Sequence, residues 1–373
     1  MNLNKEKWND VPLGINSVAL GTMGIATAGT FLSTELYHRI TDNPMVLTRL
    51  NYFLCALEIF CIVVCCFYLF FVLTKYFILK FKHLPSEFQR PSMVGSVGVT
   101  MLCFCVISNS LGWVMTNMIS DQQTRYYALI FPNILAFCAV SMQLFYMFFF
   151  FKKYIFKKGV IYQKAYASWF VPLVGVGISA AYADNLGDLL PIWYWQAIWF
   201  LAFGVFVITY PVFLYRFLFK PHTDEKHIPS MAIYASPANM LGLGFLVAFN
   251  PDRNLAGFTV NALNNVYFYE VVSIILFSWG VVSVVIYGAV YIKSLKLKEH
   301  WLAYGALTFP AAVSASGTAF YARYFFLQDF VAAYWTLFVV AVLLFLMSFY
   351  IVALLNVKYS KLLFEIFKKR GMN

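Results

Sequence analysis

Ten apolar segments dominate this sequence, and each is long enough to cross a lipid bilayer. A spanning helix needs about 20 mostly apolar residues. With 62% of the residues hydrophobic and 12% charged, nothing outside these segments is long enough for a soluble domain. We therefore predict an all-α integral membrane protein with ten transmembrane helices. The predicted spans are 11–33, 50–80, 91–113, 126–152, 166–184, 191–219, 228–249, 263–292, 301–323 and 329–356.

Lysine and arginine residues gather on one side of this predicted membrane domain. All but five of the 27 lie in the N-terminal segment, in the tail, or at and after the ends of even-numbered spans. Because basic segments stay in the cytoplasm, we expect both termini there. Residues 1–10 form a cytoplasmic segment, 11–356 the pore domain and 357–373 a basic tail. The five exceptions are Arg39, Arg49, Arg125, Arg253 and Arg323.

The net charge of +11 is explained by the same bias. Basic loops attract anionic lipid headgroups and concentrate anions at the inner face, so we expect small anions and the lipid bilayer as partners, and no nucleic acid. Cysteines lie only inside the spans, histidines show no ligand spacing, and nucleotide-binding and catalytic motifs are absent from the sequence. We expect no metal, no cofactor and no enzymatic activity, in a bacterial-type cytoplasmic (inner) membrane.

Odd-numbered and even-numbered spans differ in composition. The first span carries Gly21, Gly24 and Gly29, whereas residues 53–81 are crowded with Phe, Leu, Val and Tyr. Small residues and prolines suit helices that pack closely, bend and line a cavity, while bulky apolar side chains suit lipid-facing helices. We expect five helical hairpins, with inner odd helices around a central pore and outer even helices facing lipid or neighbouring subunits.

Prolines and small polar residues of the odd spans are the candidate pore elements. Proline deletes a backbone hydrogen bond, and we expect pore-helix kinks at Pro12, Pro172, Pro237 and Pro310. The odd spans hold no lysine or arginine at mid-membrane, so hydroxyl and backbone dipoles would have to attract an anion. The odd spans contain further small polar residues, such as Ser17, and we expect about half of all these polar residues to serve helix packing. The candidate pore-lining polar residues are Asn16, Thr22, Ser108, Ser179, Ser236 and Ser316.

Three further residues each allow two interpretations, one functional and one structural. Glu58 and Glu270 are ionisable groups within outer spans, where such groups are default functional candidates. For each we favour a structural role, as an interhelical or subunit-interface hydrogen bond, over proton coupling, which stays open. Phe309 is a large ring among small residues beside Pro310. From these residues alone it is equally well a plug of a narrow channel or a packed core side chain.

Several short motifs recur at characteristic places in the spans. In their order and spacing they resemble landmarks of the tellurite-resistance/dicarboxylate transporter family, which includes bacterial TehA and the slow anion channel of plant guard cells. The similarity extends over all ten spans. The motifs are residues 11–14 (VPLG), 170–172 (FVP), 210–212 (YPV), 235–238 (ASPA), 304–310 (YGALTFP) and 315–319 (ASGTA).

The resemblance implies five hairpins in quasi-fivefold order, a homotrimer with one pore per subunit, and a phenylalanine gate that falls on Phe309. It implies a channel that passes small anions. The alternative is a secondary transporter for C4-dicarboxylates such as malate, for sulfite or for tellurite-related oxyanions, with proton coupling through Glu58 or Glu270.

Overall fold

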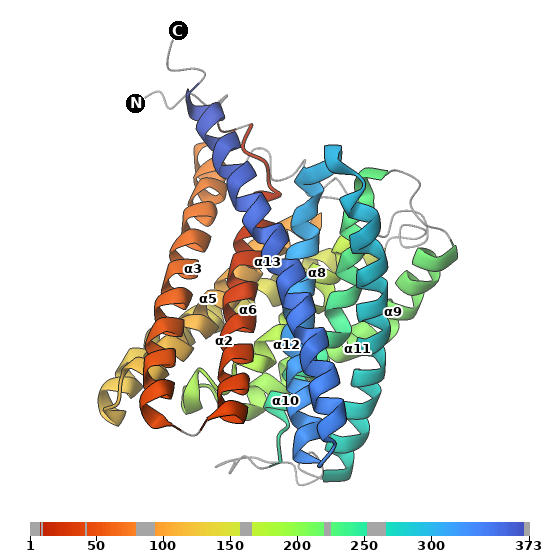
Figure 1. The fold of residues 1–373 in the computed structure, drawn as a ribbon. Helices are drawn as coiled ribbons and strands as arrows, with labels where there is room; N and C mark the ends of the chain where they lie inside the picture. Colours follow the sequence, from red (N-terminus) through yellow and green to blue (C-terminus); the bar gives the residue numbers. More distant parts are fainter. Residues whose placement is uncertain are drawn as a thin grey trace.

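The computed structural model describes residues 8, 10–41, 43–79, 94–156, 166–219, 225–251 and 266–368. This part of the chain is almost entirely helical and contains no strand. Eight helices in it are long and apolar enough to cross a membrane. The chain is thus a multi-pass helical membrane protein (Figure 1). The first residues of the third and eighth predicted spans lie outside the described residues.

The five inner segments differ in regularity. The helices α2, α5 and α12 are long, but the other two inner segments are broken into α-helical and 3₁₀ pieces. The short apolar segment Ala167–Tyr182 and the helix α12 are not among the eight long apolar helices. The prediction of ten spans is therefore confirmed in part. The bounds are α2 Ile15–Ile40, α5 Val94–Met118, η2 Ala167–Trp169 with α8 Phe170–Val174 and η3 Gly175–Tyr182, η6 Pro229–Ala235 with α10 Ser236–Ala248, and α12 Gly305–Leu327.

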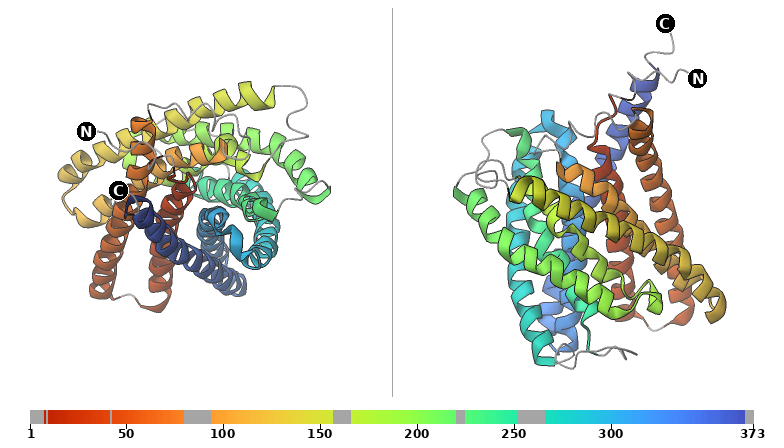
Figure 2. Two further views of the ribbon diagram at one scale, coloured as in Figure 1. Left: turned by 90° about the horizontal axis from the view of Figure 1, so that it is seen from above. Right: turned by 180° about the vertical axis from the view of Figure 1, so that it is seen from behind.

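Each inner segment is followed by a long outer helix that packs against it. Figure 2 shows α6 and α9 crossing the bundle obliquely, while α3, α11 and α13 run closer to its long axis. The bounds are α3 Pro44–Ile78, α6 Gln122–Phe150 with the π-helical turn η1 Phe151–Ile155, α9 Ile192–Phe219, α11 Val266–Leu295 and α13 Val331–Lys368.

The inner segments contact one another in a closed order. Helix α2 packs on α5, α5 on α8 and η3, η3 on α10, α10 on α12, and α12 on α2. Between 72% and 89% of the residues are buried in the apolar windows of α2, α5 and η6–α10, against 28% to 39% in the five outer helices. The contrast between small and aromatic residues in the sequence therefore separates buried from lipid-exposed helices.

Glycines bring α2 and α12 into close contact. A β-carbon on Gly21 would lie 2.4 Å from the β-carbon of Thr308, and one on Gly24 would lie 2.9 Å from that of Ala312. Real side chains do not approach so closely, so alanine at either position would push the two helices apart. Small residues at membrane helix interfaces permit such backbone approach, and van der Waals packing then holds the pair together.

The first helix continues past its predicted end at residue 33 to Ile40. Charged residues suggest the end of an apolar span, but here they neutralise each other. The Arg39 guanidinium donates to Glu35 Oε1 at 2.9 Å. It also lies 3.6 Å from the ring centre of Phe326 on α12. An ion pair one turn apart, capped by an aromatic ring, lets α2 extend with its carboxylate buried.

The prolines act in different ways. Pro12 precedes the first residue of α2, so it does not kink that helix, and the expectation of a kink there is wrong. Pro172 lies in the short α8, between two 3₁₀ turns, and Pro237 is the second residue of α10, after another 3₁₀ turn. Pro310 lies inside α12. Prolines also occur inside the outer helices α6 and α9, so they do not mark inner helices alone.

The outer helices end beside the starts of the inner helices. The Lys75 ammonium, near the end of α3, donates to the Val11 carbonyl at 2.7 Å. The Lys358 ammonium of α13 lies 5.1 Å from the ring centre of Trp301, just before α12. Lys75 lies in the last turn of α3, where a cation is favourable because the helix dipole is negative there. The basic side of the molecule is therefore the side on which the inner helices begin, at the top of Figure 1.

Candidate pore

A cavity lies where the five inner segments converge. Its volume is about 50 Å³, which is enough for a few waters, since one water needs about 10–15 Å³. All five inner segments contribute to its wall. The lining residues are Ser17 and Leu20 of α2, Val99 and Leu102 of α5, Phe170, Val171 and Gly175 of α8 and η3, Ile233, Ser236, Pro237 and Met240 of η6 and α10, and Gly305, Ala306, Phe309 and Pro310 of α12.

The wall of this cavity is apolar and carries no charged side chain. Its polar side chains are the hydroxyls of Ser17 and Ser236. Ser236 and Gly305 are the first residues of α10 and α12, so the positive ends of two helix dipoles lie at the wall. Such a wall offers a weak preference for anions without a tight binding site, which is what rapid passage requires.

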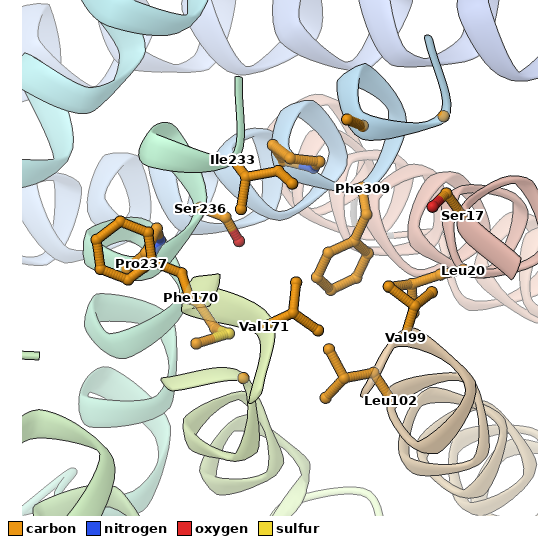
Figure 3. Close-up of a pocket in the computed structure, with 15 residues that line it drawn as sticks. Ser17, Leu20, Val99, Leu102, Phe170, Val171, Ile233, Ser236, Pro237 and Phe309 are labelled. Carbon is orange, nitrogen blue, oxygen red and sulfur yellow. The ribbon is translucent and has the colours of Figure 1, made fainter. Parts of the chain in front are cut away.

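Phe309 occupies a special place on α12. From Leu307 to Ala319 every residue is buried except Phe309, whose ring borders the cavity. In Figure 3 the ring projects from α12 toward Val171 of α8 and Leu102 of α5. A ring on one inner helix that reaches toward the opposite wall restricts the space at the axis.

The backbone next to this ring is held by side chains of neighbouring helices. The single hydroxyl hydrogen of Thr308 is shared between the Ser17 carbonyl, at 3.0 Å, and the Gly305 carbonyl, at 2.7 Å. Ser348 of α13 donates to the Thr308 carbonyl, and Tyr287 of α11 donates to the Leu307 carbonyl, both at 2.9 Å. Hydrogen bonds to three neighbouring helices thus hold this turn of α12 in place, while the Phe309 side chain borders the cavity.

Of the six predicted polar lining residues, Ser236 alone borders this cavity. Ser108 and Ser179 donate to the carbonyls of Cys105 and Val176 in their own segments. Such local bonds satisfy a buried hydroxyl where no other partner is near.

The other three predicted polar residues make different contacts. Asn16 donates to the Thr100 hydroxyl at 2.7 Å and so joins α2 to α5. Thr22 donates to its own helix and accepts from Asn356 of α13 at 3.4 Å. Ser316 donates to the Ala312 carbonyl at 3.2 Å, further along α12.

Neither of the two span carboxylates borders the cavity. Glu58 is buried in α3, and its Oε1 accepts a hydrogen bond from the Thr30 hydroxyl of α2 at 3.0 Å. Glu270 lies partly exposed in the second turn of α11, near Tyr324 of α12. Within the described residues no cluster of three or more His, Cys, Asp or Glu side chains suits a metal ion.

The sequence reading overlooked most of the cavity wall, which consists of ordinary apolar residues such as Leu20, Val99 and Met240. Gly24 stands out in the sequence only as a small residue of an inner span, whereas the structure places it against the Phe309 ring. No residue type distinguishes these positions from other core positions. A signal was present in the helical spacing, because Gly24 follows Ser17 by seven residues and so lies on the same face of α2.

A bundle of membrane-crossing helices around an axial, uncharged cavity has the architecture of a membrane channel or transporter. The sequence model of the SLAC1 family, described as voltage-dependent anion channel, matches residues 10–355. The chain therefore belongs to this family, whose members transport anions, and the resemblance in its motifs is confirmed. Comparison with individual curated proteins gives no match.

Proposed function

We propose that this protein is a passive anion channel, in which small anions cross the membrane along the axis of the five inner segments. The Phe309 ring is the gate: it blocks the axis in the closed channel and swings aside to open it. One observation carries the proposal. The ring is the one residue between Leu307 and Ala319 that is not buried, and it borders a cavity walled by all five inner segments.

The surroundings of the ring support a gating role. Its backbone is held by Thr308, Ser348 and Tyr287, so rotation of the side chain alone changes the opening. Rotation of a side chain that borders a cavity can change the opening without a rearrangement of helices. An apolar ring in a narrow pore also excludes water, and hydrophobic constrictions of this kind close a pore by dewetting.

The finer arrangement follows the family. We propose ten helices in five hairpins, three subunits with one pore each, and the basic side in the cytoplasm. Basic residues of the outer helices, such as Lys75 near the end of α3 and Lys358 within α13, lie beside the starts of the inner helices. Their field raises the anion concentration at the inner mouth.

A carrier for dicarboxylates, sulfite or tellurite-related oxyanions is the competing function. A proton-coupled carrier needs a carboxylate that faces the substrate path in at least one state. Glu58 instead joins α2 to α3 through Thr30, and Glu270 lies at the start of an outer helix. The contacts of both residues favour the channel.

Anion current through purified protein in planar bilayers tests the gate. We expect Phe309→Ala to raise the conductance by about tenfold or more, equal to a shift of about 1.4 kcal/mol or more between closed and open states. Reversal potentials in chloride, nitrate and malate gradients then rank the anions.

Phe349→Ala is the matched control, because that ring lies on α13 and is 51% exposed on the outer surface. It removes the same side chain away from the cavity and leaves the conductance unchanged. Conductance of Phe309→Ala at the wild-type level would overturn the gate. Saturable, proton-dependent uptake into vesicles without channel current would instead establish a carrier.

A further inference from the structure

Two aromatic rings of α2 and α12 meet beyond Phe309, in the second half of each helix. Phe31 of α2 and Phe320 of α12 stack face to face, with ring centres 3.9 Å apart and planes 13° from parallel. Both side chains are only partly buried, although their neighbours Thr30, Leu32 and Ala319 are buried. A stacked pair that keeps exposed surface inside a tightly packed pair of helices borders open space.

Helical register places both rings on the faces that line the cavity. On α2, Phe31 follows Ser17 by fourteen residues and Gly24 by seven, so the three share one face. On α12, Phe320 follows Phe309 by eleven residues, which is close to three full turns. Ser17 and Phe309 border the cavity. The same faces therefore present Phe320 about 16 Å beyond Phe309 and Phe31 about 21 Å beyond Ser17 along the helix axes.

The roll of α2 about its axis is fixed next to this pair. The Thr30 hydroxyl donates to the buried Glu58 of α3 at 3.0 Å. Gly29 faces Phe345 of α13, whose ring carbons Cε2 and Cζ would lie 3.2 and 3.4 Å from a β-carbon there. Gly29 and Thr30 thus face the outer helices. Because successive helical residues point about 100° apart, Phe31 points away from these outer helices.

We propose that the stacked Phe31–Phe320 pair is a second constriction of the pore, in series with Phe309, so that a short segment containing Ser316 is closed at both ends. This inference rests on the proposed channel function. Ser316 follows Phe309 by seven residues and precedes Phe320 by four, on the same face of α12. The two constrictions differ in construction: one ring from one helix closes the inner end, and two rings from two helices close the outer end.

Water access to Ser316 tests the second constriction without any measurement of anion current. The full chain carrying Ser316→Cys is placed in vesicles and treated, from one side at a time, with a negatively charged, membrane-impermeant methanethiosulfonate. The modification rate is followed by intact-protein mass spectrometry. The unsubstituted chain, with its seven native cysteines, sets the background.

The two ends of the segment give opposite expected results. With Ser316→Cys alone, reaction is slow from either side. Adding Phe320→Ala or Phe31→Ala raises the rate from the side of the α12–α13 loop by on the order of tenfold, and leaves the rate from the basic side unchanged. Adding Phe309→Ala does the reverse. Adding Phe349→Ala changes neither rate.

Conductance gives an independent check. When two gates in series open independently, the open probability of the pore is the product of the two. We therefore expect the fold-increase in conductance of the double variant Phe309→Ala/Phe320→Ala to be the product of the fold-increases of the two single variants. Phe320→Leu and Phe31→Leu keep most of the apolar volume and lose the stacking. These leucine variants replace the alanine variants in the same measurements if an alanine variant does not fold.

Fast reaction of Ser316→Cys from the loop side with both rings present would overturn the second constriction. Unchanged rates in both ring variants would identify the stacked rings as a packing contact and overturn it as well. If the proposed channel function is wrong, Phe309→Ala carries no current while the labelling pattern persists. This result is distinguishable from failure of the second constriction.

Discussion

The ring of Phe309 lies against the backbone of Gly24. A β-carbon on Gly24 would come within 3.1 Å of ring carbon Cδ2 and 3.7 Å of Cε2. The ring that borders the cavity from α12 therefore rests partly on α2, at a position where the absence of a side chain makes room for it. The proposed gate and its seat belong to different inner helices, so a change in the spacing of the two helices also changes the fit of the ring.

We expect Gly24→Ala to raise the basal anion conductance. The added methyl would meet Phe309 at 3.1 Å and the Ala312 β-carbon at 2.9 Å. The closed ring must move away from its seat, while a ring swung aside is not affected. Overpacking of this kind also lowers the free energy of unfolding by about 1–3 kcal/mol. Bilayer conductance and thermal unfolding in detergent measure the two effects.

Gly204→Ala is the control for this prediction, because a β-carbon there has no atom within 4 Å. The substitution leaves the conductance unchanged and stabilises α9 by up to about 1 kcal/mol. A fall in conductance in Gly24→Ala would mean that the ring rests on Gly24 in the open channel, which contradicts our assignment.

Glu58→Gln is expected to leave the conductance and its pH dependence unchanged, as is Glu270→Gln. Glutamine keeps an oxygen that accepts from the Thr30 hydroxyl, so the link between α2 and α3 survives. Glu58→Leu removes the link and lowers the free energy of unfolding by about 1–3 kcal/mol.

A double-mutant cycle shows whether that loss comes from the hydrogen bond. Thr30→Val should add little once Glu58→Leu is present. Abolished transport in either glutamine variant, together with a lost pH dependence, would favour the proton-coupled carrier.

Arg39→Ala is expected to lower the free energy of unfolding by about 2–3 kcal/mol, because the Glu35 carboxylate stays buried without its partner. The Glu35 side chain is 4% exposed and the Arg39 side chain 20%. Arg39→Lys keeps the charge but loses the planar contact with the Phe326 ring, and is expected to lose about 1 kcal/mol.

Adding Glu35→Gln to Arg39→Ala removes the unpaired charge, so it should recover part of the lost stability. Thermal unfolding of the detergent-solubilised protein measures each variant. Equal stability of Arg39→Ala and the wild type would show that the pair is solvated and contributes nothing.

The sequence by itself determined the class of protein and the separation of its helices. Apolar length predicts membrane spans because the bilayer core has a fixed thickness. Small residues identify the inner segments because only they permit the approach seen between Gly21 and Thr308. The motif around Phe309 indicated the gate candidate, since a large ring is conspicuous among small residues. These properties depend on residues that are close together in the sequence, so they can be predicted without the tertiary structure.

The tertiary structure alone decided which neighbouring residues face the axis. Asn16 and Ser17 are adjacent in sequence and equally suitable as pore-lining residues, yet Ser17 borders the cavity and Asn16 bonds to Thr100 of α5. Adjacent helical residues point about 100° apart, and the roll of α2 that chooses between them is set by contacts with α3, α5, α12 and α13. Those contacts join residues tens to hundreds of positions apart, so no local pattern can encode the choice.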